Sequence, residues 1–308
     1  MKKFAVALLA ALTAFSCTPR AAAPNTGGIR CIGEGQADYW QARQDGRLTM
    51  LRTVAAVMAD YENVPAGSRR DQFDALLVSV MRANPEIITL YTVWKPNAID
   101  GMDLRYIGRP GSTPTGQYAT AVSRETGAVT LRASTDYVGA MEYFNGPNSK
   151  KERALNPEQR TVQGKETWML RFMVPIVNPR TNETVGGVGC HFDFADIQRG
   201  LVQALSKNEV IAAMAIYDNT GFIIASYIPE RIGKNLRDVD TIYGGSLNDA
   251  FQSVQRGDYA QYSSYSQVLG KNVQIQLTPF QIGNSDRTWT VMIAAADGLI
   301  PFHRLFRK

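Results

Sequence analysis

The hydrophobic pattern of the chain changes period twice, and each change follows the same order. Apolar residues first recur every three or four positions, as in Leu48, Leu51 and Val54, which places them on one face of a helix. From Ile87–Trp94 onward the chain carries short β-branched and aromatic runs divided by Gly, Pro and Asn turns. A helical pattern returns at Ile197–Leu205, and a second series of short strands follows it. Two units of helix followed by antiparallel strands predict an α+β protein with two modules.

The same patterns predict the boundaries of the segments. Residues 133–165 are polar and irregular, so no helix or strand is predicted for them. The predicted segments are a signal segment at 1–17, a Pro/Ala/Gly/Thr-rich tether at 18–36, a long N-terminal helix at 37–66, a first module at 67–206, a second module at 207–298 and a C-terminal tail at 299–308.

The N-terminus has the pattern of an export signal. Lys2 and Lys3 precede an apolar stretch from Phe4 to Phe15, which is shorter than the roughly 20 residues that a membrane-spanning helix needs. The stretch ends in Ala14-Phe15-Ser16-Cys17, which resembles a bacterial lipobox and predicts a lipidated Cys17. An ordinary signal peptide cleaved near residues 21–23, or a short uncleaved anchor, are the alternatives. Each of the first two interpretations places the chain outside the cytoplasm, in the periplasm or cell envelope.

The remaining cysteines, Cys31 and Cys190, leave two alternatives open. An oxidising compartment would allow them to form a disulfide. Cys190, however, lies in an apolar strand pattern where a buried free thiol is common. Spacing alone does not decide between a pair and two separate thiols.

Composition and charge exclude several classes of protein. Hydrophobic residues make up 44% of the chain and charged residues 20%, which is ordinary globular usage. The formal net charge is +5, and it is spread along the chain without a block of like charges. We therefore expect no nucleic-acid partner.

The chain carries no motif for catalysis, metal binding or a cofactor. His191 and His303 are its only histidines, and it has no CxxC, so no zinc site is expected. There is no GxSxG sequence, and no Gly-Lys pair has the spacing of a phosphate-binding loop. We predict that the protein is not an enzyme and uses no cofactor.

The order of several short motifs resembles the double-Cache sensor domains of bacterial chemoreceptors and sensor kinases. The motifs of the first module are Asn84-Pro85-Glu86-Ile87, Asp100-Gly101-Met102-Asp103 with Tyr106, Met173-Val174-Pro175-Ile176 and the stretch from Val185 to Ile197. Those of the second are Ala215-Ile216-Tyr217-Asp218 with Gly221, Ile224-Ala225-Ser226, Gly233-Lys234-Asn235-Leu236 and Trp289-Thr290-Val291. No motif is specific by itself, but together they cover nearly all of the chain after residue 37.

The resemblance implies an α+β fold in which a long N-terminal helix flanks two PAS-like modules, each an antiparallel sheet with helices. The first module would be membrane-distal and would hold a small-molecule ligand, and the second would be membrane-proximal. The candidate ligand-binding residues are Tyr91, Trp94, Tyr106, Gln117, Tyr118, Asn156, Arg171 and His191.

Each candidate also has a structural interpretation. Tyr91 and Trp94 are an odd number of residues apart, so both cannot face the same side of a regular strand. Tyr106 and Tyr118 could be core residues, Arg171 could face solvent, and His191 could be a hydrogen-bonded structural histidine.

The sequence departs from the amino-acid-binding members of the family. Gln117 stands where those members have an arginine for the ligand carboxylate, and His191 stands where they have an aspartate for the ammonium group. Asn156 replaces a second carboxylate. Because a buried ammonium group needs a carboxylate partner, we predict a ligand other than a typical α-amino acid, either neutral or anionic.

The sequence does not determine to which protein the domain passes its signal. No apolar span follows the second module in the sequence given, which ends in a basic amphipathic segment at residues 299–308. We expect a lipid-anchored sensor that presents its ligand to a separate membrane receptor or transporter. The alternative is a structural or protein-interaction lipoprotein that keeps the Cache fold without a ligand.

Overall fold

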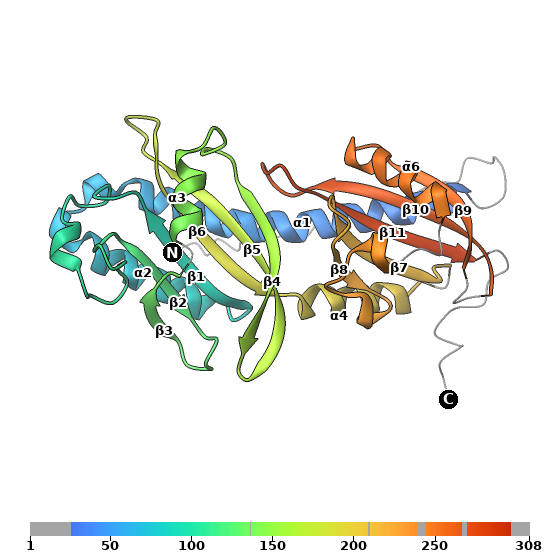
Figure 1. The fold of residues 1–308 in the computed structure, drawn as a ribbon, viewed down its shortest axis with the longest axis horizontal. Helices are drawn as coiled ribbons and strands as arrows, with labels where there is room; N and C mark the ends of the chain where they lie inside the picture. Colours follow the sequence, from blue (N-terminus) through green and yellow to red (C-terminus); the bar gives the residue numbers. More distant parts are fainter. Residues whose placement is uncertain (1–25, 136, 209, 240–243, 267–269, 297–308) are drawn as a thin grey trace, which may run out of the picture.

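The computed structural model describes residues 26–135, 137–208, 210–239, 244–266 and 270–296. Two sheets lie side by side along one long helix, α1 (Thr26–Ala59) (Figure 1). The α+β fold with two antiparallel modules is confirmed. The predicted signal segment, Cys17 and the C-terminal tail lie outside the described residues.

The first module, which we name the distal module, contains a six-stranded antiparallel sheet in the order β3-β2-β1-β6-β5-β4. Helices α2 and α3 lie on its two sides. Its elements are α2 (Arg69–Ala83), β1 (Ile87–Trp94), the 3-10 turn η3 (Asp103–Tyr106), β2 (Ala119–Ser123), β3 (Thr130–Ala133), α3 (Tyr137–Asn145), β4 (Arg153–Val162), β5 (Lys165–Val177) and β6 (Thr184–Asp193).

The second module, which we name the proximal module, contains a five-stranded antiparallel sheet in the order β8-β7-β11-β10-β9. Its helices and strands are α4 (Ala195–Ser206), β7 (Ala213–Asp218), β8 (Ile223–Ser226), α5 (Leu236–Val239), α6 (Gly244–Gln255), β9 (Ala260–Ser266), β10 (Lys271–Gln281) and β11 (Thr288–Ala296). Helix α4 falls within the predicted first module, at 67–206, but it packs against β7 and β8 of this sheet.

Helix α1 supplies one apolar face to both sheets. It packs against β5 and β6 of the distal sheet and against β10 and β11 of the proximal sheet. Trp40, Leu48 and Leu51 are fully buried on this face. They belong to one continuous core that includes Phe172 of β5 and Trp289 of β11. The two modules therefore share a core along the helix.

Helix α1 begins earlier than the sequence pattern predicts. Residues 26–36, which we assigned to a tether, form its first turns. Ile29 is buried there, but Gly33 interrupts the apolar period one turn later. A Cβ at Gly33 would lie 2.7 Å from the Gln276 side chain, so the glycine allows α1 to approach β10 closely. The helix also ends at Ala59, short of the predicted residue 66, and a 3-10 turn, η1 (Tyr61–Asn63), follows it.

Two elements lie where no regular structure was predicted. Helix α3 and strand β4 both fall within residues 133–165. Helix α3 spans only nine residues, too short for a clear helical period. Strand β4 contains Asn156-Pro157, and its pairing with β5 shifts register between Leu155 and Glu158, which breaks the alternation that marks a strand.

Cys190 is a buried free thiol in β6. Of the two alternatives for the cysteines, a pair between Cys31 and Cys190 is therefore not formed. Burial raises the pKa of the Cys190 thiol far above its usual value. This thiol thus acts as a small apolar side chain.

None of the helices in the described part of the chain is both long and apolar enough to cross a membrane.

Replacing Trp40 with alanine should destabilise both modules together. Trp40 is fully buried, and Gly200 of α4 packs closely against its ring. Removing such a side chain costs about 3–5 kcal/mol. Urea unfolding followed by circular dichroism should show one transition at a lower midpoint, whereas Val57→Ala, at an exposed position on α1, should change little. Two separate transitions would contradict a shared core.

Candidate ligand-binding site

The face of the distal sheet opposite the shared core is covered by α3. Tyr91, Val93 and Met173 of the sheet pack there against Ala140 and Phe144 of the helix. Two glycines of β6 make room for the aromatic rings. A Cβ at Gly189 would lie 2.2 Å from the Tyr91 ring, and one at Gly187 would lie 2.4 Å from the Phe144 ring. The glycine-rich sequence of β6 thus lets aromatic rings lie directly on the sheet.

A cavity of about 360 Å³ opens beside this cluster. Its volume is at the lower end of the range for small-molecule sites. The wall mixes apolar and charged side chains from the sheet and from α3. The lining residues are Tyr91, Gly139, Ala140, Glu142, Tyr143, Arg153, Leu155, Arg171 and Met173. We refer to this space as the distal cavity.

His191 lies in a separate small pocket on the other side of Tyr91. Tyr91 lines both spaces, and its ring meets the His191 imidazole edge to face at 5.5 Å between centroids. The pocket, of about 10 Å³, is the size of a single water molecule. His191 is 4% exposed, and its Nδ1 has no hydrogen-bond partner among the described residues. A buried polar atom without a partner is costly, and one water molecule in this pocket would satisfy it.

Three arginines and two glutamates form a chain of ion pairs around His191. Glu125 pairs with Arg132 at 3.0 Å and with Arg160 at 3.3 Å. Glu158 pairs with Arg160 and, at 2.8 Å, with Arg171. The five groups carry one more positive than negative charge.

These arginines affect the protonation of His191. Burial lowers the pKa of His191 well below its usual value, and the charges of Arg160, Arg171 and Arg132 lower it further. His191 is therefore neutral at physiological pH, and the positive charge of this region resides on the arginines.

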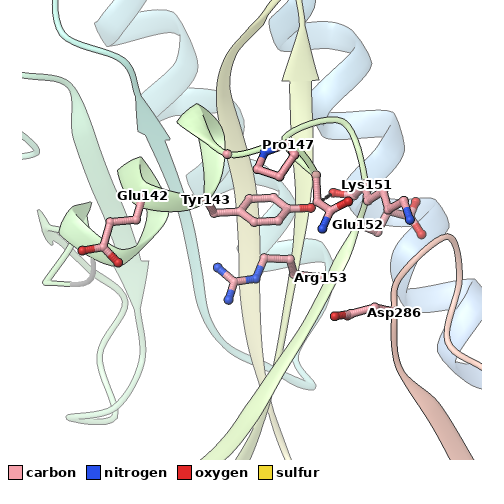
Figure 2. Close-up of a pocket in the computed structure, with 9 residues that line it drawn as sticks. Glu142, Tyr143, Pro147, Lys151, Glu152, Arg153 and Asp286 are labelled. Carbon is pink, nitrogen blue, oxygen red and sulfur yellow. Dashed lines mark hydrogen bonds between the residues drawn. The ribbon is translucent and has the colours of Figure 1, made fainter. Parts of the chain in front are cut away.

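A second cavity, of about 250 Å³, lies where the two modules meet (Figure 2). Glu142, Tyr143 and Arg153 line it as well as the distal cavity. Asp286 reaches it from the hairpin between β10 and β11, so residues of both modules form its wall. We refer to this space as the junction cavity.

Glu152, at the edge of the junction cavity, joins three parts of the fold. Its carboxylate accepts two hydrogen bonds from Arg52 of α1, at 2.5 and 2.9 Å, and one from the Asn284 N–H of the proximal hairpin, at 2.7 Å. Glu152 is 7% exposed. A Cβ at Gly283 would lie 2.2 Å from this carboxylate, so a glycine is needed where the hairpin approaches.

Arg153, the next residue, forms part of the wall between the two cavities. Its guanidinium lies 4.5 Å from the centroid of the Tyr143 ring. The two side chains are neighbours in Figure 2. The Tyr143 hydroxyl donates a hydrogen bond to the Lys151 carbonyl. Burial raises the pKa of Tyr143 to about 12, so the phenol stays neutral and does not offset the charge of Arg153.

The structure brings three of the predicted site residues together. Tyr91 and Arg171 line the distal cavity, and Tyr91 and His191 line the small pocket. Arg171 and His191 are paired neighbours on β5 and β6. Asn156 lies at the irregular part of β4, and its side chain is outside what the structure describes.

The other predicted residues lie away from the cavities. For Trp94 the reason is strand parity, because it is three residues from Tyr91 in β1 and therefore faces the opposite side of the sheet. Trp94 is fully buried in the shared core, stacked on Phe73 of α2. Tyr118 is buried on the same side, and its hydroxyl donates to Asp74. Gln117 is buried, and its side-chain amide donates a hydrogen bond to the Trp94 carbonyl.

Tyr106 lies on η3 and covers a buried arginine. The Arg70 guanidinium is 3.8 Å from the centroid of the Tyr106 ring. Arg70 is 3% exposed and pairs with Asp100 and Asp103, each at 2.7 Å. Tyr106 therefore stabilises the loop after β1 and does not face the distal cavity.

Several residues of the site were not predicted from the sequence. Arg132, Arg153 and Arg160 on β3 and β4, and Glu142 and Tyr143 on α3, line one of the cavities or pockets. Strand β4 was not predicted, because the shift in its pairing between Leu155 and Glu158 interrupts the alternation of side chains that follows Arg153. Across the described residues there is no cluster of side chains that could hold a metal ion.

The fold is that of the double-Cache extracellular sensor domains. The extracellular domain of the putative histidine kinase mmHK1S-Z2 superposes with a TM-score of 0.72 at 21% identity, over 87% of this chain and 96% of that one. The periplasmic sensory domain of the Campylobacter jejuni chemoreceptor Tlp1 has a TM-score of 0.66 at 14% identity, over 92% of this chain and 98% of that one. The ligand-binding domain of the Pseudomonas fluorescens chemoreceptor CtaA, in complex with L-isoleucine, has a TM-score of 0.55 at 13% identity, over 88% of this chain and 92% of that one.

At these identities the likeness establishes the fold alone. No protein-family model matches the sequence, and no curated protein is significantly similar to it.

The neutral state of His191 predicts a pH dependence of stability. An unfolded histidine has a pKa of about 6.5, and the pKa of His191 in the folded protein is lower. Below about pH 6.5 the unfolded chain therefore binds more protons at this residue, and the free energy of unfolding falls by up to about 1.4 kcal/mol per pH unit. Above that pH the contribution is constant.

The measurement compares the native chain with His191→Gln by urea unfolding at about pH 7.5 and about pH 5.5. The variant should lose about 1 kcal/mol less stability than the native chain over this interval. Glu125, Glu158 and the three arginines are unchanged in both proteins, so the difference reports on His191. Equal losses would show that the fold does not lower the pKa of His191.

Replacing Glu152 with alanine should weaken the contact between the modules. The change removes an acceptor of the Asn284 N–H and leaves Arg52 without its partner. Because the Arg52 side chain is 40% exposed and screened by water, we expect a loss of about 1–2 kcal/mol in urea unfolding. Glu142→Ala, at an exposed position of α3, is the matched control. A loss no larger than that of the control would mean that the ion pair does not stabilise the junction.

Proposed function

We propose that this chain is an extracytoplasmic sensor domain that binds a small molecule in the distal cavity. The observation that carries the proposal is a cavity of about 360 Å³, between a sheet and a helix, whose wall mixes charged and apolar side chains. Such cavities provide apolar burial together with a few orienting polar groups. The likeness to sensory ectodomains supports a binding role over an enzymatic one.

The charges favour a ligand other than a typical α-amino acid. CtaA has been crystallised with L-isoleucine, whose ammonium group needs a carboxylate partner when it is buried. Glu142 is the one acidic side chain among the described lining residues of the distal cavity, and it is exposed on α3. The arginines of the wall instead favour a neutral or anionic ligand.

We propose a place in the cell envelope on the basis of the N-terminal sequence. The apolar stretch before Cys17 has the length of an export signal, and Cys17 stands at the lipidation position of a lipobox. A lipid at Cys17 would hold the sensor at a membrane surface, where it would report to a separate receptor or transporter.

The proposed function is tested by a thermal-shift screen of residues 26–308 against amino acids, organic acids, purines, sugars and polyamines. A ligand at 100 times its Kd adds about 2.7 kcal/mol to the free energy of unfolding, which raises the Tm measurably. A hit should weaken in Arg171→Ala and be followed by calorimetry. We expect no tight binding of the common L-amino acids.

Two outcomes would contradict these proposals. Tight binding of an L-amino acid in calorimetry would refute the predicted ligand class. A screen without any hit would favour the alternative of an interaction lipoprotein that keeps the Cache fold.

A further inference from the structure

Arg153 is the cationic group of the distal cavity that is most available to a ligand. Its guanidinium has five N–H donors, and its one contact through that group, among the described residues, is with the face of the Tyr143 ring. The side chain is half-buried and borders both cavities. The other arginines on this face, Arg132, Arg160 and Arg171, are each paired with a glutamate.

Arg171 lies close enough to share a ligand group with Arg153. In the pairing of β4 with β5, Arg153 is opposite Met173 and Arg171 is opposite Leu155. The two arginines are thus diagonal neighbours on one face, about 7–8 Å apart at their Cα atoms. Long side chains at that separation can converge on one small group.

The lining of the distal cavity favours a planar anion. The described charged groups of its wall are Arg153, Arg171, which is paired with Glu158, and Glu142, which is exposed to solvent. Arginine forms paired hydrogen bonds with a carboxylate in one plane, and the Tyr143 ring covers the Arg153 guanidinium from one side. The apolar part of the wall, formed by Ala140, Leu155 and Met173, would contact the carbon skeleton.

We propose that the ligand is a small carboxylic acid whose carboxylate is held by Arg153, with Arg171 beside it. This inference rests on the proposed function, because it concerns the ligand of the same cavity. It adds the chemical class of the ligand and the residue that recognises it.

Matched pairs of an acid and its amide isolate the charge. Propionate and propionamide, succinate and succinamide, and benzoate and benzamide have nearly the same shape, and only the first of each pair is anionic. Calorimetry and thermal shift at constant ionic strength should show at least one acid binding at least about tenfold more tightly than its amide. Methyl phosphate is included to compare a phosphate with a carboxylate.

Arg153→Gln should weaken binding of that acid about tenfold or more while the unliganded protein keeps its circular dichroism spectrum. Arg153→Lys keeps the charge but loses the paired donors. Its affinity for the acid should lie between those of the native protein and of Arg153→Gln. Arg82→Gln removes the same charge from an exposed position on α2 and should change the affinity less than twofold.

The outcomes separate this inference from the proposed function. Equal binding of an acid and its amide, tighter binding of methyl phosphate, or an affinity unchanged in Arg153→Gln would each overturn it. Binding of a neutral metabolite from the wider screen, with none of the three acids bound, would overturn the carboxylate assignment and leave the sensor function in place. If neither set yields a ligand, both are overturned.

Discussion

The burial of one face of α1 against both sheets is the constraint on which the rest of the structure depends. Trp40 is buried on this face at the level of α4, and Leu48 and Leu51 follow it within the same core. A single helix of 34 residues thus sets the distance between the modules. Because interiors are closely packed and yield little, a shift of one sheet along α1 would disturb the packing of the other.

The junction adds a polar connection to this apolar one. Glu152 and Arg153 are consecutive residues of the distal module with different partners. Glu152 holds α1 through Arg52 and the proximal hairpin through Asn284, whereas Arg153 borders the distal cavity. Any displacement of the backbone at the start of β4 would therefore act on both the cavity and the contact between modules. A double-mutant cycle of Arg153 and Glu152 would measure this coupling directly.

The sequence predicted the fold better than the site, for a physical reason. Long periodic segments such as Ile87–Trp94 follow local rules, and the strands found there agree with them. The site depends on which face each strand residue takes and on which strands become neighbours. Tyr91 and Trp94 could not both face one side, but parity alone did not say which one faces the cavity. Arg171 is paired with His191, and Arg153 is a diagonal neighbour of Arg171, only because β4, β5 and β6 are adjacent in the sheet.

The neutral state of His191 also bears on what the site can recognise. The imidazole of His191 carries no negative charge that could hold an ammonium group. Its lowered pKa means that it supplies no positive charge in exchange at physiological pH. The net charge of the site is thus set by arginines, which remain charged at any physiological pH, and by the glutamates that pair with three of them. Arg153 is not among those three and has no carboxylate partner among the described residues. Its charge lies at the cavity wall, where a carboxylate would offset it.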